Sequence, residues 1–111
     1  FYPEKFAHWG HGLIGDGFKT IIMIRRYVHN PVDSYEKKIN INLNLYSKDK
    51  SVEKHIEVSY NSWNYIQIDQ SDFDNSLQTF SWRFKAKKGD CEVFWVSFNE
   101  ITGAICGEHG F

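Results

Sequence analysis

The chain has 111 residues, of which 41% are hydrophobic and 17% are aromatic, and its formal net charge is −1 at pH 7. This length fits a single domain over residues 1–111, and the aromatic content excludes a disordered chain. The near-zero net charge argues against a nucleic-acid partner, and no apolar run reaches the roughly 20 residues that membrane insertion needs. The sequence does not indicate a cellular compartment.

The predicted elements of the first half are strands. A strand is predicted at residues 18–28, where β-branched residues and a glycine-rich entry at Gly12, Gly15 and Gly17 favour a strand over a helix. Strict alternation of apolar and polar residues predicts two further strands, at residues 39–45 and 54–60. A hairpin turn at residues 47–50 is expected to join them.

The second half of the chain continues this pattern. Its predicted elements are, in order, strand 63–68, acidic loop 69–78 with at most one helical turn, strand 80–85, turn 88–90, strand 92–98, turn 99–103 and strand 104–106. If the turn at 88–90 is tight, Lys85 lies opposite Glu92 and the two form a cross-strand pair.

About seven or eight strands at this spacing predict an all-β fold, an antiparallel β-sandwich. The varied strand lengths and the long polar loop favour a sandwich over a closed barrel. Side chains that are in phase on an alternating strand, or that belong to the apolar run at residues 93–96, are expected in the core. They are Ile41, Leu43, Phe80, Trp82, Phe84, Phe94 and Val96.

Two short pairs of potential metal ligands lie near the two ends of the chain. His8 and His11 form one pair, Cys106 and His109 form the other, and each pair has two residues between its members. Three imidazoles and one thiolate suit four-coordinate zinc, and the ends of a compact domain often lie close together. Because both pairs occur in glycine-rich segments, we expect no strand geometry to separate the members of a pair. The alternative is that the glycines form turns in which the histidines bind backbone groups.

Two tryptophans form a second candidate site. Trp82 and Trp95 are in phase with apolar neighbours, so we expect them in the core. Trp9 and Trp63 have polar or glycine-rich neighbours, and we expect them at the surface, where a flat ring can stack on a sugar. No nucleophile elbow, phosphate loop or dinucleotide fingerprint occurs in the sequence, which disfavours an enzyme without excluding one.

The stretch from Thr20 to Asp69 resembles the sensory-rhodopsin transducer family. The resemblance is carried by the strand Thr20–Arg26, the alternating run Ile39-Asn-Ile-Asn-Leu-Asn-Leu-Tyr46, the turn Ser47-Lys-Asp-Lys50 and the closing Ile66-Gln-Ile-Asp69. It covers under half of the chain. The resemblance implies a small β-sandwich that assembles as a homo-oligomer, with partner binding and sugar binding as its proposed roles, and it implies no site residue.

These patterns favour a non-catalytic binding or assembly module that recognises a protein or carbohydrate partner. We also expect a homo-oligomer, because long alternating strands leave edges that a second copy can cover. The alternative is a small metal-binding protein or metal-dependent enzyme that uses the terminal His and Cys pairs. The first interpretation needs no cofactor, whereas the second needs zinc.

Overall fold

The computed structural model describes residues 6–26, 38–48, 50–59, 62–69, 73, 77–86 and 91–109. Every regular element in these residues is a strand, and no helix among them is long and apolar enough to span a membrane. The strands are β1 (Phe6–Ile14), β2 (Phe18–Arg26), β3 (Lys38–Tyr46), β4 (Ser51–Ser59), β5 (Trp63–Ile68), β6 (Gln78–Ala86), β7 (Cys91–Asn99) and β8 (Ile105–His109).

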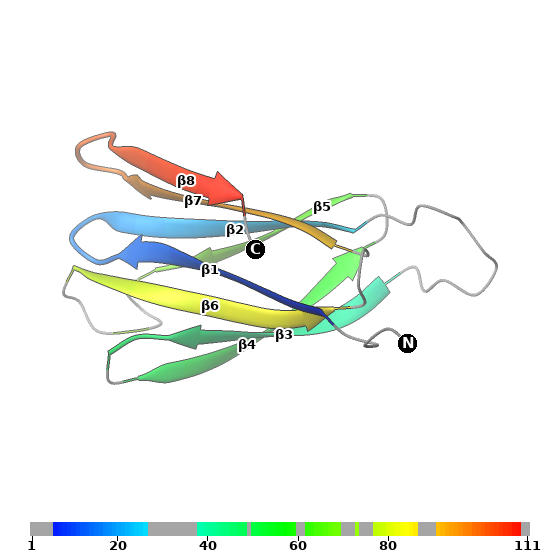
Figure 1. Ribbon diagram of the computed structural model, residues 1–111. Coiled ribbons are helices and arrows are strands. Elements are labelled where there is room, and N and C mark those ends of the chain that lie inside the picture. The colour runs from blue at the N-terminus through cyan, green and yellow to red at the C-terminus, as the bar shows by residue number, and fades with distance from the viewer. Residues whose placement is uncertain are drawn as a thin grey trace.

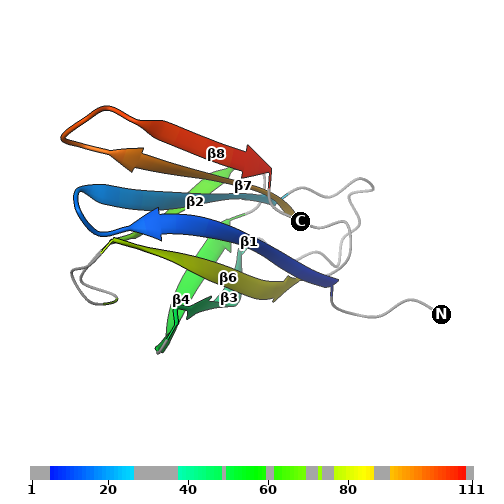
Figure 2. The ribbon, with the colours of Figure 1, turned by 60° about the vertical axis from the view of Figure 1, so that its left-hand side comes forward.

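The eight strands form two four-stranded antiparallel sheets that pack face to face (Figure 1, Figure 2). Sheet A has the order β1-β6-β3-β4, and sheet B has the order β5-β2-β7-β8. The expected all-β sandwich is therefore confirmed. The predicted acidic loop at residues 69–78 lies largely outside the described residues, as do the last two residues of the strand expected at 18–28.

The core lies between the two sheets, and alternation along each strand decides which side chains enter it. In β3, Ile41, Leu43 and Leu45 point inward and are at most 2% exposed, as expected from their period of two. The predicted core residues of β6 are also buried. They are Phe80, Trp82 and Phe84.

The expected burial of Phe94 and Val96 is wrong. Both are only half-buried, because β7 turns Val93 inward instead and places Phe94 and Val96 on the outer face of sheet B. The predicted core tryptophan of this strand, Trp95, packs against the core and is half-buried. The strand carries large apolar side chains on both faces, so its sequence does not reveal which face is covered.

Strand β1 was not predicted, because its residues fall in the glycine-rich stretch where we expected no strand geometry. Its glycines lie directly opposite large rings of β6, because Gly10 pairs with Trp82 and Gly12 pairs with Phe80. A Cβ atom on Gly10 would overlap the Trp82 ring, and one on Gly12 would lie 2.6 Å from the Phe80 ring. The two rings therefore occupy the space that side chains at these positions would need, and glycine is compatible with this strand for that reason.

The turn between β1 and β2 also takes the chain from sheet A to sheet B. Residues 15–17 all have positive φ angles, which favours glycine at positions 15 and 17. The expected pair of Lys85 and Glu92 is wrong for a related reason. Strand β6 belongs to sheet A and β7 to sheet B, so Lys85 pairs with Ala7 and Glu92 pairs with Arg25.

Side-chain hydroxyl groups of sheet B bind the backbone of the edge strand β1. The Leu13 N–H donates to Thr20 Oγ1 at 3.1 Å and to Ser97 Oγ at 3.0 Å, and the Thr20 hydroxyl donates to the Leu13 carbonyl at 2.8 Å. The two hydroxyl oxygens are 2.7 Å apart, and both residues are fully buried. The indole N–H of Trp82 donates to the His11 carbonyl at 3.2 Å. Leu13 and the His11 carbonyl are thus hydrogen-bonded on the side of β1 where none of the described strands pairs with it.

We expect Thr20→Val to lower the free energy of unfolding by about 1–3 kcal/mol, because the variant keeps the shape of the side chain but leaves the part-buried Leu13 carbonyl without its donor. Urea denaturation measures the change. The matched control is Thr79→Val, since Thr79 is exposed on β6. Equal stabilities for the two variants would show that the hydroxyl network does not hold β1 in place.

Candidate functional site

The two histidines of the predicted zinc site lie on opposite faces of β1. His8 faces the core, is 8% exposed and stacks on Phe84 with 5.0 Å between ring centroids. His11 is exposed on the outer face and lies edge-on to Trp9 at 5.8 Å. Our expectation that strand geometry does not apply at these positions is therefore wrong, because residues three apart on a regular strand point in opposite directions.

The second pair lies on β8. Cys106 is exposed and pairs in register with Ser97 of β7, and the backbone of His109 pairs with Phe94, while the His109 side chain lies outside the description. Within the described part of the chain, no group of three or more His, Cys, Asp or Glu side chains could hold a metal ion. The four-residue zinc site stays a prediction, and the geometry of its first pair counts against it.

Trp9 and Trp63 are both at the surface, as expected, but they lie on different sheets. Trp9 is 45% exposed on the outer face of sheet A. Trp63 is 41% exposed on the outer face of sheet B, where Arg25 lies 5.8 Å from its ring and Phe94 packs against it at 5.6 Å. The two tryptophans therefore belong to separate surfaces, and a single flat ligand cannot stack on both.

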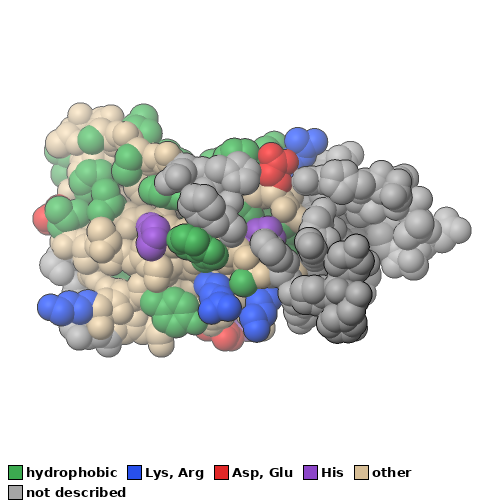
Figure 3. Space-filling view, in the orientation of Figure 1, with side chains coloured by type: hydrophobic (Ala, Val, Ile, Leu, Met, Phe, Trp, Pro, Cys, Tyr) green, Lys and Arg blue, Asp and Glu red, His purple; other side chains and the backbone are tan. Residues whose placement is uncertain are grey.

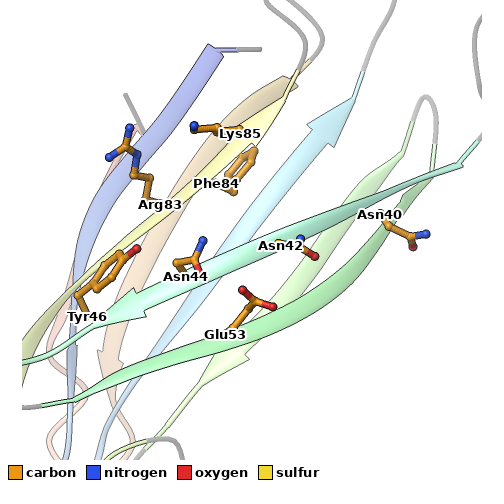
Figure 4. Close-up of a pocket in the computed structure, with 8 residues that line it drawn as sticks. All are labelled: Asn40, Asn42, Asn44, Tyr46, Glu53, Arg83, Phe84 and Lys85. Atoms are coloured by element: carbon orange, nitrogen blue, oxygen red, sulfur yellow. The ribbon is translucent and has the colours of Figure 1, made fainter. Parts of the chain in front are cut away.

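The outer face of sheet A carries an open hollow of about 460 Å³. It exists because β3 and β6 pair over three positions only, from Asn44 with Arg83 to Tyr46 with Ser81. The two strands then separate, as Figure 4 shows. The hollow is lined by polar side chains of three strands and by Phe84. The polar lining residues are Asn40, Asn42, Asn44 and Tyr46 of β3, Glu53 of β4, and Arg83 and Lys85 of β6.

The asparagines follow from the alternation that builds the core. Each inward apolar residue of β3 has an outward asparagine as its neighbour, so Asn40, Asn42 and Asn44 share one face of the strand. An amide side chain offers two N–H donors and a carbonyl acceptor. Three amides in a row therefore present donors and acceptors at the regular spacing of alternate residues on a strand.

A histidine of β4 orders two of the lining side chains. His55 Nδ1 lies 2.6 Å from the amide oxygen of Asn42, and its Nε2 lies 3.2 Å from the Glu53 carboxylate. All three residues are on the outer face of sheet A, where Asn42 and His55 are directly opposite each other. Such exposed contacts add little to stability, but they restrict the rotamers of Asn42 and Glu53.

Two exposed aromatic side chains lie on the same face as the hollow. Trp9 is directly opposite Arg83 across the β1–β6 ladder, and Tyr46, also 45% exposed, is opposite Ser81 on the other side of β6. Figure 3 shows hydrophobic, His, and Lys or Arg side chains gathered over β1 and β6. This surface, formed by the hollow with Trp9 and Tyr46, is called the polar face below.

Of the residues on the polar face, the sequence predicted Trp9 as a binding residue. The asparagines indicate the solvent-exposed face of a strand, but three of them at alternate positions are also a signal of a binding surface. Tyr46 ends the same alternation and could have been grouped with them. The hollow itself depends on where β3 separates from β6, which no local pattern encodes.

Comparison of this chain with protein-family models, curated proteins and solved structures finds no match. The resemblance of residues 20–69 to the transducer family therefore stays a prediction.

We expect EDTA to leave the melting temperature of the purified protein unchanged. An ion bound only by the folded chain would add its binding free energy to stability, so its removal would lower the melting temperature. Differential scanning fluorimetry with and without EDTA, together with metal analysis, measures this. Cys106→Ser is the control, since it removes one predicted ligand at an exposed position. Stoichiometric zinc, with a melting temperature that EDTA lowers in the wild type and not in the variant, would establish the terminal site.

Proposed function

We propose that the protein is a non-catalytic carbohydrate-binding module and that the polar face of sheet A is its binding surface. The observation that carries this proposal is the combination of an open, amide-lined hollow with two exposed aromatic rings on the same face. Sugars present hydroxyl groups at their rims and C–H groups on their ring faces. A surface that binds them therefore needs mixed donors and acceptors beside flat apolar rings.

The arrangement fits this chemistry group by group. Asn42 and Asn44 supply both donors and acceptors, Glu53 supplies acceptors only, and Arg83 supplies donors only. Figure 4 shows the amide of Asn44 directed toward the gap between β3 and β6, whereas the amide oxygen of Asn42 contacts His55 of β4. The open shape of the hollow suits one segment of an extended oligosaccharide that lies along the face.

Binding without catalysis is favoured by the acidic groups of the hollow. Most glycosidases use two carboxyl groups that flank the scissile bond, one as acid and one as base or nucleophile. Among the residues described around the hollow, Glu53 is the single carboxylate, and its oxygen faces His55. This supports recognition of a saccharide rather than its hydrolysis.

We expect Trp9→Ala to weaken oligosaccharide binding at least tenfold, which corresponds to about 1.4 kcal/mol, because the variant removes the ring on which a sugar stacks. A panel of oligosaccharides on an array, followed by isothermal titration calorimetry of the best ligand, measures the effect. Unchanged melting temperatures would show that the variant is folded.

Trp63→Ala is the matched control for this experiment. Trp63 is exposed to a similar extent but lies on the outer face of sheet B, so its loss leaves saccharide affinity unchanged. Equal losses for both tryptophan variants, or no binding by the wild type to any saccharide of the panel, would contradict the proposed function.

The homo-oligomer expected from the sequence stays a prediction, and hydrophobic exposure on sheet B favours it. Tyr65 is 64% exposed on β5, and Ile105 is 73% exposed on the edge strand β8. Exposed apolar groups and open strand edges are common features of surfaces that a second copy covers. We expect multi-angle light scattering at micromolar concentration to give a multiple of the monomer mass, and a strict monomer over a broad concentration range would contradict it.

A further inference from the structure

Two cationic side chains of the polar face have no acidic partner among the residues that the structure describes. Arg83 and Lys85 are alternate residues of β6, so both point to the outer face of sheet A, and both are exposed. Within the residues that the structure describes, neither side chain makes a hydrogen bond or an ion pair. Two other lysines in these residues are paired: Lys19 lies 2.9 Å from Glu100, and Lys38 lies 3.3 Å from Glu57.

The carboxylates of the same face are already engaged. Glu53 faces the His55 ring at 3.2 Å, and Glu57 is paired with Lys38. Around the hollow, Arg83 and Lys85 contribute two positive charges against the single negative charge of Glu53. The β6 side of the hollow is therefore positive, although the net charge of the whole chain is −1.

The two cations lie between the stacking ring and the amides. Arg83 pairs in register with Trp9 on one side and with Asn44 on the other, and Lys85 is two residues further along β6. Figure 4 shows the two side chains extending from β6 to the same side. A sugar ring that stacks on Trp9 and reaches Asn44 must pass over Arg83.

We propose that the saccharide bound by the polar face carries an anionic group, a carboxylate or a sulfate, and that Arg83 and Lys85 hold it. This inference rests on the proposed function. The planar guanidinium of Arg83 matches two oxygens of either group, and the Lys85 ammonium adds a point charge beside it. Because both cations are exposed, salt screens the attraction, and the preference for the charged ligand falls as ionic strength rises.

The test compares saccharides that carry the anionic group with counterparts in which that group is esterified or removed. The probes are tetragalacturonate and its fully methyl-esterified form, and a sulfated galactan oligosaccharide with its desulfated form. We expect the wild type to bind one charged probe at least tenfold more tightly than its neutral counterpart in low salt. The pair that shows the preference identifies the anion as carboxylate or sulfate.

The double variant Arg83→Gln/Lys85→Gln removes both charges and keeps hydrogen-bonding groups. We expect it to lose the preference, so that it binds the charged and neutral probes with equal affinity. The control is Lys38→Gln, on the same face, whose charge is already paired with Glu57. This control retains the preference of the wild type.

The outcomes separate this inference from the function on which it rests. Equal affinity of the wild type for charged and neutral probes, with binding that still depends on Trp9, overturns the anionic preference and leaves a neutral-saccharide module. A preference that survives in the double variant overturns the assignment to Arg83 and Lys85. A wild type that binds none of the four probes, nor any saccharide of the wider panel, overturns both proposals.

Discussion

The fold depends on how the free edge of β1 is satisfied. An edge strand exposes backbone N–H and C=O groups, and burying them unpaired costs free energy. Here Thr20 and Ser97 reach across from sheet B and bind the Leu13 backbone in place of a neighbouring strand. The same bonds fasten the two sheets together at one side. On its other side, β1 pairs with β6 along its whole length, which places Trp9 opposite Arg83 on the polar face.

Much of the fold was predictable from strands that have one polar face exposed to solvent. The alternation in β3 fixes both the strand and its phase, because asparagine and isoleucine differ so strongly in polarity. The same reasoning failed for β7, whose two faces are both apolar. It failed for β1 because the glycines there leave space for the Trp82 and Phe80 rings, which are about 70 residues away in sequence. A local pattern cannot reveal a strand whose residues are selected by distant neighbours.

The candidate site likewise has features that local sequence predicts and features that depend on strand pairing. Exposure of Trp9 could be inferred from its neighbours, whereas the polar face required the pairing of β6 with both β1 and β3. The zinc hypothesis assumed that the glycine-rich segments are not strands, and a spacing of three places ligands together on a turn and apart on a strand. His8 and His11 thus point to opposite faces of β1. Secondary structure had to be known before the motif could be interpreted.

The short ladder between β3 and β6 has a mechanical consequence. Strands β1 and β6 share nine paired positions, as do β3 and β4, but only three pairs join these two ribbons into one sheet. Sheet A therefore consists of two long strand pairs joined by a short ladder. A rotation of one strand pair relative to the other changes the width of the hollow. A ligand that contacts β3 and β6 together bridges the two strand pairs. Such a ligand would restrict the motion of one pair of strands relative to the other. Ligand binding and the rigidity of sheet A would therefore increase together.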